Sequence, residues 1–218
     1  ISPSRQALLG AEASVYYLAV NLEDETMANK DLRHAISLAI NRQNIVDTLF
    51  EGGREPADNV FPPIIDKKGG SWEFAEYDPE KAKQIIDEKG LAGTSVTLSY
   101  NSGGGHEDIM SCIQADLQAV GLTVEQDTKE WAAYLQGLTD GTFQMGRLGW
   151  IADYPTLDNF ISPNFYSTAD NNYSRYANAE VDAAIDAARA IADEDERKDA
   201  YRAINKMVAD DMPIIPIM

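Results

Sequence analysis

Cysteine, histidine, positive charge and long apolar runs are all scarce in this chain. One cysteine among 218 residues excludes an internal disulfide, so cysteine usage does not reveal the compartment. No apolar run approaches the roughly 20 residues that a membrane-spanning helix needs. Lysine and arginine together number 18 against 36 aspartates and glutamates, which gives a net charge of −18. A surface this acidic repels nucleic acid and anionic membranes, so neither is an expected partner.

The residues of common catalytic and metal sites are missing or badly placed. No Gly-x-Ser-x-Gly motif is present, and Cys112 falls on the apolar side of an expected helix, where a cysteine serves packing. His34 and His106 lie in unrelated settings, without the histidine or cysteine spacing of a zinc site. The sequence therefore favours a chain with no catalytic centre, no metal site and no cofactor.

Alternating strand-like and helix-like segments predict the fold class. Residues 94–100, 122–127 and 143–150 favour strands, and single helical segments at 106–120 and 129–138 separate them. Such crossovers imply an α/β fold with a mixed, largely parallel sheet flanked by helices. Another strand is expected at 15–22. Helices are expected at 31–40, 43–50, 79–89, 179–192 and 195–209, a surface connection at 60–77 and an irregular loop at 152–176.

A glycine-rich turn, residues 101–106, joins an expected strand to the next helix. It lacks the Gly-Lys-Ser/Thr of a P-loop and the third glycine of a dinucleotide fingerprint. Glu107 and Asp108 open the helix instead, and their carboxylates would repel a phosphate. Two interpretations stay open: a flexible turn, or a backbone that a ligand approaches closely with His106 facing it.

Asp153 is the residue that most strongly suggests a function. It follows the expected strand 143–150, and ligands of open α/β sheets bind where strands end. Taken alone, an aspartate before Tyr154 and Pro155 is ordinary turn chemistry and predicts a turn cap. The loop beyond it is rich in aromatic residues, which either anchor the loop to the core or line a pocket.

Four segments together resemble one family over nearly the whole chain. They are residues 17–21 (YLAVN), residues 32–42 (LRHAISLAINR), residues 149–154 (GWIADY) and residues 211–216 (DMPIIP). In these segments the chain resembles the second lobe of the peptide-type solute-binding proteins of ABC importers. Asn41 stands where the family usually has aspartate, and the residues after Tyr154 depart from the family's Tyr-x-Asp-Pro.

The resemblance implies a site for the amino-terminal end and backbone of a peptide. Asp153 matches the aspartate that pairs with the free α-amino group, which needs a charged partner when it leaves water. Trp150, Ile151 and Ala152 match the segment whose backbone pairs with the extended peptide as an added strand.

The resemblance also implies residues near the other end of the peptide. Arg147 and His106 match cationic positions that in some oligopeptide binders face the peptide's carboxylate. Asn101 matches a position near the cleft.

Membership of this family would make residues 1–218 a ligand-binding lobe and not an enzyme, with 15–22 and 213–218 crossing between lobes. The expected partners are short peptides, the first lobe of the same chain and a membrane permease. The expected location is extracytoplasmic, in the periplasm or at the cell surface as a lipoprotein, without direct membrane insertion. Because the sequence opens at Ile1 without methionine and closes in an apolar run, we expect an excised fragment.

Three alternatives remain at this stage. The same superfamily includes binders of nickel, haem and sugar oligomers, which lack the amine-pairing aspartate. A hydrolase that used Asp153 would need a second carboxylate or a histidine against it, and the sequence shows none close by. An interaction domain would present the acidic helices near the C-terminus as its contact surface.

Overall fold

A five-stranded sheet in the order β3-β2-β4-β1-β5 forms the centre of the computed structural model, which describes residues 10–218. The strands are β1 (Ser14–Val20), β2 (Ser95–Asn101), β3 (Thr123–Lys129), β4 (Met145–Ile151) and β5 (Ile214–Pro216). β2 pairs in parallel with β3 and β4, whereas β1 pairs antiparallel with β4 and β5. The expected α/β class with a mixed sheet is confirmed, and its parallel part comprises β2, β3 and β4. The opening residues Ile1, Ser2 and Pro3 lie outside the described residues.

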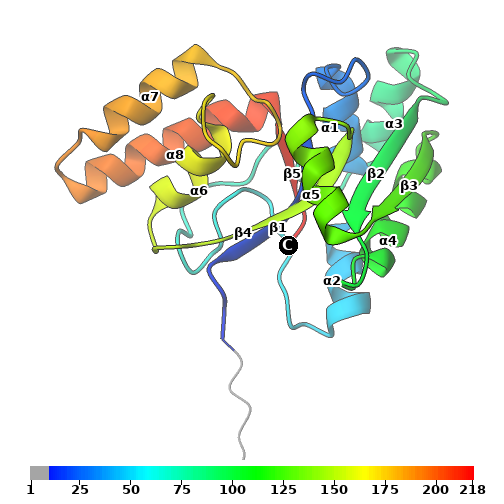
Figure 1. Cartoon of the computed structure of the whole chain (residues 1–218), viewed down its shortest axis with the longest axis horizontal. Helices are drawn as coiled ribbons and strands as arrows, with labels where there is room; N and C mark the ends of the chain where they lie inside the picture. The colour runs from blue at the N-terminus through cyan, green and yellow to red at the C-terminus, as the bar shows by residue number, and fades with distance from the viewer. Residues whose placement is uncertain (1–9) are drawn as a thin grey trace, which may run out of the picture.

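Helices flank this sheet (Figure 1). They are α1 (Lys30–Ala39), α2 (Arg42–Phe50), α3 (Pro79–Glu88), α4 (Glu107–Ala119), α5 (Trp131–Asp140), α6 (Leu157–Phe165), α7 (Ala179–Arg189) and α8 (Glu194–Asp211). Side-chain caps determine where five of them begin, because a capping oxygen satisfies backbone N–H groups that have no partner in the first turn. The capping residues are Asn29, Asn41, Asp78, Asn178 and Asp193.

The helices form two groups on either side of the antiparallel strands. Helices α4 and α5 make the crossovers β2-α4-β3 and β3-α5-β4, which run in opposite directions along the sheet, so right-handed connections place them on opposite faces. Figure 1 shows α5 in front of the sheet, and α6, α7 and α8 packed together on the far side of β4 and β1.

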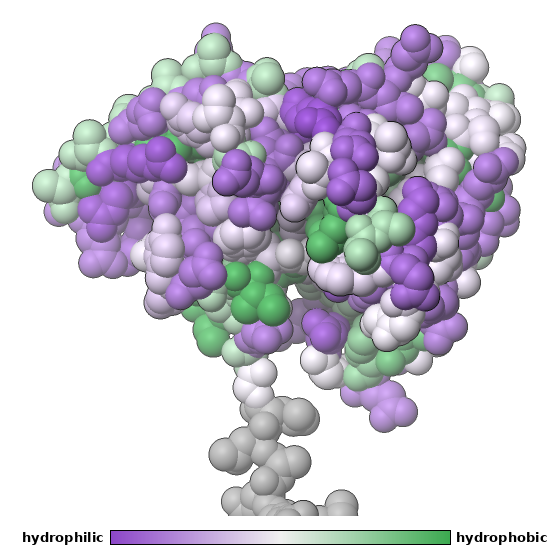
Figure 2. Space-filling model, in the orientation of Figure 1, coloured by the Kyte–Doolittle hydropathy of each residue, from purple (hydrophilic) through white to green (hydrophobic). Residues whose placement is uncertain are grey.

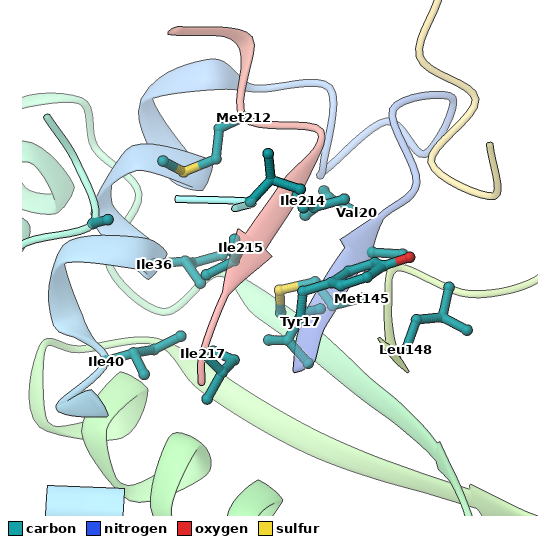
Figure 3. Close-up of a cluster of buried hydrophobic side chains, with 14 of the residues drawn as sticks. Tyr17, Val20, Ile36, Ile40, Met145, Leu148, Met212, Ile214, Ile215 and Ile217 are labelled. Atoms are coloured by element: carbon teal, nitrogen blue, oxygen red, sulfur yellow. The ribbon is translucent and has the colours of Figure 1, made fainter. Parts of the chain in front are cut away.

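Buried aliphatic side chains fill the space between α1 and β5 (Figure 3). Ile36 of α1 and Ile40, the residue just after that helix, pack near Ile215 and Ile217, and all four side chains are fully buried. Full burial of one such side chain contributes about 1.5–3 kcal/mol. The C-terminal segment is therefore part of the core of this chain.

Segments 15–22 and 213–218 lie side by side. Leu18 pairs with Ile215 in the β1–β5 ladder, and the N–H of Ile217 donates to the carbonyl of Tyr16 at 2.9 Å. Their role as crossings into a second lobe remains a prediction.

The connection between α2 and α3 contains no helix or strand, but parts of it are buried, whereas the sequence predicts a surface connection. Phe61 and Trp72 are buried, and buried Arg42 donates to the carbonyl oxygens of Ala75 at 2.8 Å and Pro216 at 2.6 Å. Burial lowers the pKa of Arg42 to about 10. The connection is thereby fixed beside β5, where it shields an edge of the sheet.

The prediction of an irregular loop over 152–176 was wrong in its first half, where α6 forms. Ser162-Pro163 looked like a turn, yet Pro163 lies inside the helix. Proline lacks only the one N–H that would bond back to the carbonyl of Asn159. Phe160 and Phe165 are fully buried, so packing of these aromatic side chains stabilises a helix that local sequence disfavours.

Candidate ligand-binding site

The second half of β4 is paired along one edge only. On one side its pairing with β1 continues as far as Ile151. On the other side β2 pairs with Met145 and Gly146 alone, and then stays with β3 to its end. A fork therefore opens between β2 and β4 beyond Gly146.

The backbone of two residues of β4 faces this fork. The N–H of Ala152 donates to the carbonyl of Ala13 at 2.9 Å, so Ala152 faces the β1 side. Alternate residues of a strand direct their N–H and C=O groups to the same neighbour. The polar backbone groups of Gly149 and Ile151 consequently point away from β1, and no strand of the described residues pairs with them.

Arg147 lies beside the fork in a cluster with Tyr16, His106 and Asn101. Its guanidinium lies 5.1 Å from the centre of the Tyr16 ring, and the Tyr16 hydroxyl is 3.2 Å from Nδ1 of His106. Arg147 Nε and Asn101 Oδ1 are buried without a hydrogen-bond partner among residues 10–218. Buried polar atoms without partners are rare. The cluster therefore contains one donor and one acceptor that the described residues leave unsatisfied.

The electrostatics of this cluster leave a single positive charge. Burial, and then the neighbouring charge of Arg147, lower the pKa of His106 to about 4. Burial also raises the pKa of the Tyr16 hydroxyl above its usual range. At neutral pH His106 and Tyr16 are both uncharged, and Arg147 is the charged member of this cluster.

The glycine-rich turn holds His106 in this position. Gly103 and Gly105 have φ values of 74° and 71°, a backbone conformation that residues other than glycine rarely adopt. At Gly104 a Cβ atom would lie 2.3 Å from Nε2 of His106 and 3.1 Å from the Asn101 amide nitrogen. The glycines therefore let the imidazole fold back over the turn.

Asp153 lies at the exit from β4 with its carboxylate exposed. Its backbone N–H donates to Oδ1 of Asn159 at 2.9 Å, and the same oxygen accepts from Nε1 of Trp150 at 3.2 Å. Within the part of the chain that the structure describes, the Asp153 carboxylate caps no turn. The turn is held by buried Asn159 of α6, and the Asp153 side chain is left available.

Three apolar side chains near this site are exposed: Ile151 is 65% exposed, Trp131 49% and Tyr154 48%. Ile151 belongs to the site expected from the sequence, whereas Trp131 was not singled out. Trp131 opens α5, with its ring centre 6.3 Å from that of Tyr134. A tryptophan at the first position of a helix, directly after the carboxyl end of a strand, is the sequence signal that would have pointed to it.

Comparison with known families gives the chain its place. Residues 3–172 match the family described as bacterial extracellular solute-binding proteins, family 5 (middle region). The chain belongs to this family. This family membership agrees with the resemblance found in residues 17–21, 32–42, 149–154 and 211–216.

Relatives of this family-5 chain include both peptide and haem binders by name. The dipeptide-binding protein of Escherichia coli K12 is 30% identical over 94% of this chain, and heme-binding protein A of Haemophilus influenzae is 29% identical over 99%. Among solved structures, the Helicobacter pylori periplasmic binding protein DppA in complex with the peptide STSA superposes with a TM-score of 0.85, at 28% identity over 94% of this chain.

The family-5 chain spans about two fifths of the length of these relatives, with 40% of the dipeptide-binding protein and 41% of the heme-binding protein covered. Among the described residues, no helix has the length and apolar character required to cross a membrane. Nor do residues 10–218 bring together three or more His, Cys, Asp or Glu side chains in a group suited to a metal ion.

Proposed function

We propose that this chain is the lobe of an ABC-importer solute-binding protein that binds short peptides in an extended conformation. The observation that carries the proposal is the open edge of β4, with cationic Arg147 at its start and anionic Asp153 just beyond its end. A strand edge binds any peptide backbone, and two opposite charges match the two ends of a free peptide.

In this proposal the peptide backbone pairs with Gly149 and Ile151. Both residues direct their backbone polar groups into the fork, and glycine leaves room for close approach. The N–H of Ala152 is already bonded to Ala13, so Ala152 and Trp150 act by holding the strand in register. Backbone pairing fixes the ligand without selecting its side chains.

Asp153 receives the α-amino group of the peptide. Its carboxylate has no competing cation among the described residues, and Asn159 fixes the backbone from which it projects. A charge-assisted hydrogen bond is roughly twice as strong as one between neutral groups. The pair gains further when closure of the protein removes water from it.

Arg147 receives the carboxylate of the peptide. Its buried Nε has no hydrogen-bond partner within residues 10–218, and neutral His106 leaves the cluster with one positive charge, matching one carboxylate. Arg147 and Asp153 are six positions apart in the chain, which at about 3.3 Å per residue is at most about 20 Å. A peptide of up to about five or six residues fits that span, because each residue extends about 3.5 Å.

The remaining site belongs to a second lobe in this proposal. The chain covers about 40% of the dipeptide-binding relative, and segments 15–22 and 213–218 lie together at one edge of the sheet, where two crossings between lobes would run. The full-length protein then works outside the cytoplasm and delivers its peptide to a membrane permease.

Native mass spectrometry of the full-length protein purified from its host tests this function. We expect a mixture of short peptides as copurified ligand, and micromolar binding of added trialanine in calorimetry. Because one relative is named as a heme-binding protein, absorbance in the Soret region is recorded on the same sample. Bound haem, a sugar oligomer or a metal chelate in place of peptides would overturn the proposal.

A further inference from the structure

Tyr134 of α5 lies at the point where β2 and β4 separate. Its hydroxyl oxygen is 2.7 Å from the carbonyl oxygen of Arg147 and 3.2 Å from that of Ser99. A hydroxyl has one proton to donate, so the shorter contact, to Arg147, receives it. The side chain is buried, so water does not compete for these carbonyl groups.

If β2 and β4 continued to pair beyond Gly146, their next hydrogen bond would have the Arg147 carbonyl as its acceptor. The N–H of Thr97 points toward β4, since it donates to the Gln144 side chain at 2.8 Å, whereas the N–H of Ser102 donates to Lys129 of β3 at 2.9 Å. By alternation along the strand, the N–H of Asn101 points toward β4. Continued pairing beyond Gly146 would bond that N–H to the Arg147 carbonyl.

We propose that Tyr134 is a positioning residue, a wedge between β2 and β4 that ends their ladder. Its hydroxyl donates to the Arg147 carbonyl, which would otherwise accept from the Asn101 N–H. The strands therefore separate, and the far end of β4 keeps an open edge. The value of that open edge to a ligand rests on the proposed function. The effect on strand pairing does not.

Gly146 admits the Tyr134 side chain to this position. A Cβ atom at Gly146 would lie 3.1 Å from the Tyr134 hydroxyl oxygen and 2.8 Å from Cδ2 of Leu138. Burial raises the pKa of Tyr134 above its usual range, so the hydroxyl keeps its proton and remains a donor. The last paired residue of β4 on the β2 side is thus also the residue that makes room for the wedge.

The test replaces Tyr134 by phenylalanine and follows amide hydrogen exchange in the ligand-free chain. Tyr100→Phe is the matched control, because it removes a partly buried hydroxyl of β2 that donates to Gln126, on the β3 side. We expect the Asn101 amide to exchange at least about tenfold more slowly in Tyr134→Phe than in the control, since it gains the Arg147 carbonyl as acceptor. Trialanine binding to the full-length protein should weaken at least about tenfold in the same variant, a change of about 1.4 kcal/mol.

The two readouts separate the wedge from the peptide site. Unchanged or faster exchange of the Asn101 amide in Tyr134→Phe overturns the wedge, whatever happens to binding. If exchange slows as expected while the unsubstituted full-length protein binds no peptide, the wedge stands and the proposed function falls. If exchange slows but peptide binding matches that of Tyr100→Phe, the wedge ends the ladder without serving the ligand, and the positioning role is overturned.

Discussion

At the scale of single residues, the site depends on polar groups that the fold leaves without partners. Arg147 Nε and Asn101 Oδ1 are buried and unpaired within residues 10–218, and the Asp153 carboxylate is exposed. An unmade hydrogen bond in a buried place costs about 1–3 kcal/mol, so a ligand that supplies the partner recovers that free energy.

His106 gives the folded chain a dependence on pH. Its folded pKa of about 4 lies below the ordinary value of 6.5, so between these two values the unfolded chain binds more protons than the folded chain. The stability that neutral His106 permits is therefore fully present above pH 6.5 and is lost as the pH falls toward 4. By pH 4.5 the loss amounts to at most about 2.5 kcal/mol.

Urea unfolding of the chain and of His106→Gln, each at pH 7.5 and pH 4.5, measures this dependence. Other groups titrate equally in both proteins, so the difference between the two losses isolates His106. We expect the unsubstituted chain to lose about 2 kcal/mol more than the variant on acidification. Equal losses in the two proteins would show that His106 titrates normally in the folded state.

At the scale of the elements, α6 positions the end of β4 through a single side chain. Oδ1 of Asn159 accepts from the N–H of Asp153 and from Nε1 of Trp150. Removing that oxygen leaves two donors without their partner. We expect Asn159→Ala to reduce the free energy of unfolding by about 1–3 kcal/mol and to accelerate exchange of the Asp153 amide.

The matched control for this prediction is Asn171→Ala, an exposed asparagine in the connection after α6. Surface changes of this kind usually stay within about 0.5 kcal/mol. Chemical denaturation gives the stability, and amide exchange at Asp153 gives the local effect. An Asn159→Ala variant as stable as the control, with unaltered Asp153 exchange, would mean that another contact holds the turn.

Most elements could be predicted because their local signals agree with the fold. Asn29, Asp78 and Asp193 are caps that precede apolar periodicity, and the expected helices at 31–40, 79–89 and 195–209 match α1, α3 and α8 closely. Helix α6 was missed because Pro163 argues locally for a turn, while the burial of Phe160 and Phe165 is a tertiary effect that no local pattern reveals.

The candidate site could be predicted only in part. The sequence places Asp153 after a strand, and the family resemblance supplies roles for Arg147 and His106. The fork itself depends on where the β2–β4 pairing stops. The periodicity of a strand determines which face each side chain occupies, but not where pairing with a neighbour ends. From the sequence Tyr134 resembles an ordinary helical core residue, and only the fold places its hydroxyl on the Arg147 carbonyl.

At the scale of the whole molecule, the open edge of β4 faces solvent in this chain alone. A two-lobed binder encloses its ligand by closing, which supplies desolvation and a second set of contacts. Charge pairs exposed to water contribute little, about 0–1 kcal/mol each. We therefore expect residues 1–218 alone to bind trialanine in the millimolar range or not at all, a binding free energy of about 4 kcal/mol or less.

Isothermal calorimetry on the 218-residue chain, with the full-length protein in parallel, checks this expectation. Micromolar binding by the chain alone would show that a second lobe is dispensable and that the site is already complete.

The pairing of Asp153 with a peptide's amino group is the central claim, and a double-mutant cycle in the full-length protein tests it most directly. The affinities of the unsubstituted protein and of Asp153→Asn are measured for trialanine and for N-acetylated trialanine, with Asp170→Asn, an exposed aspartate of the α6–α7 connection, as control. Loss of one partner of a desolvated charge pair costs about 2–5 kcal/mol, or roughly 30- to 5000-fold in affinity. We predict that acetylation weakens binding by about that factor in the unsubstituted protein and in the control, but much less in Asp153→Asn, because both changes remove the same interaction. An equal effect of acetylation in all three proteins would contradict the account.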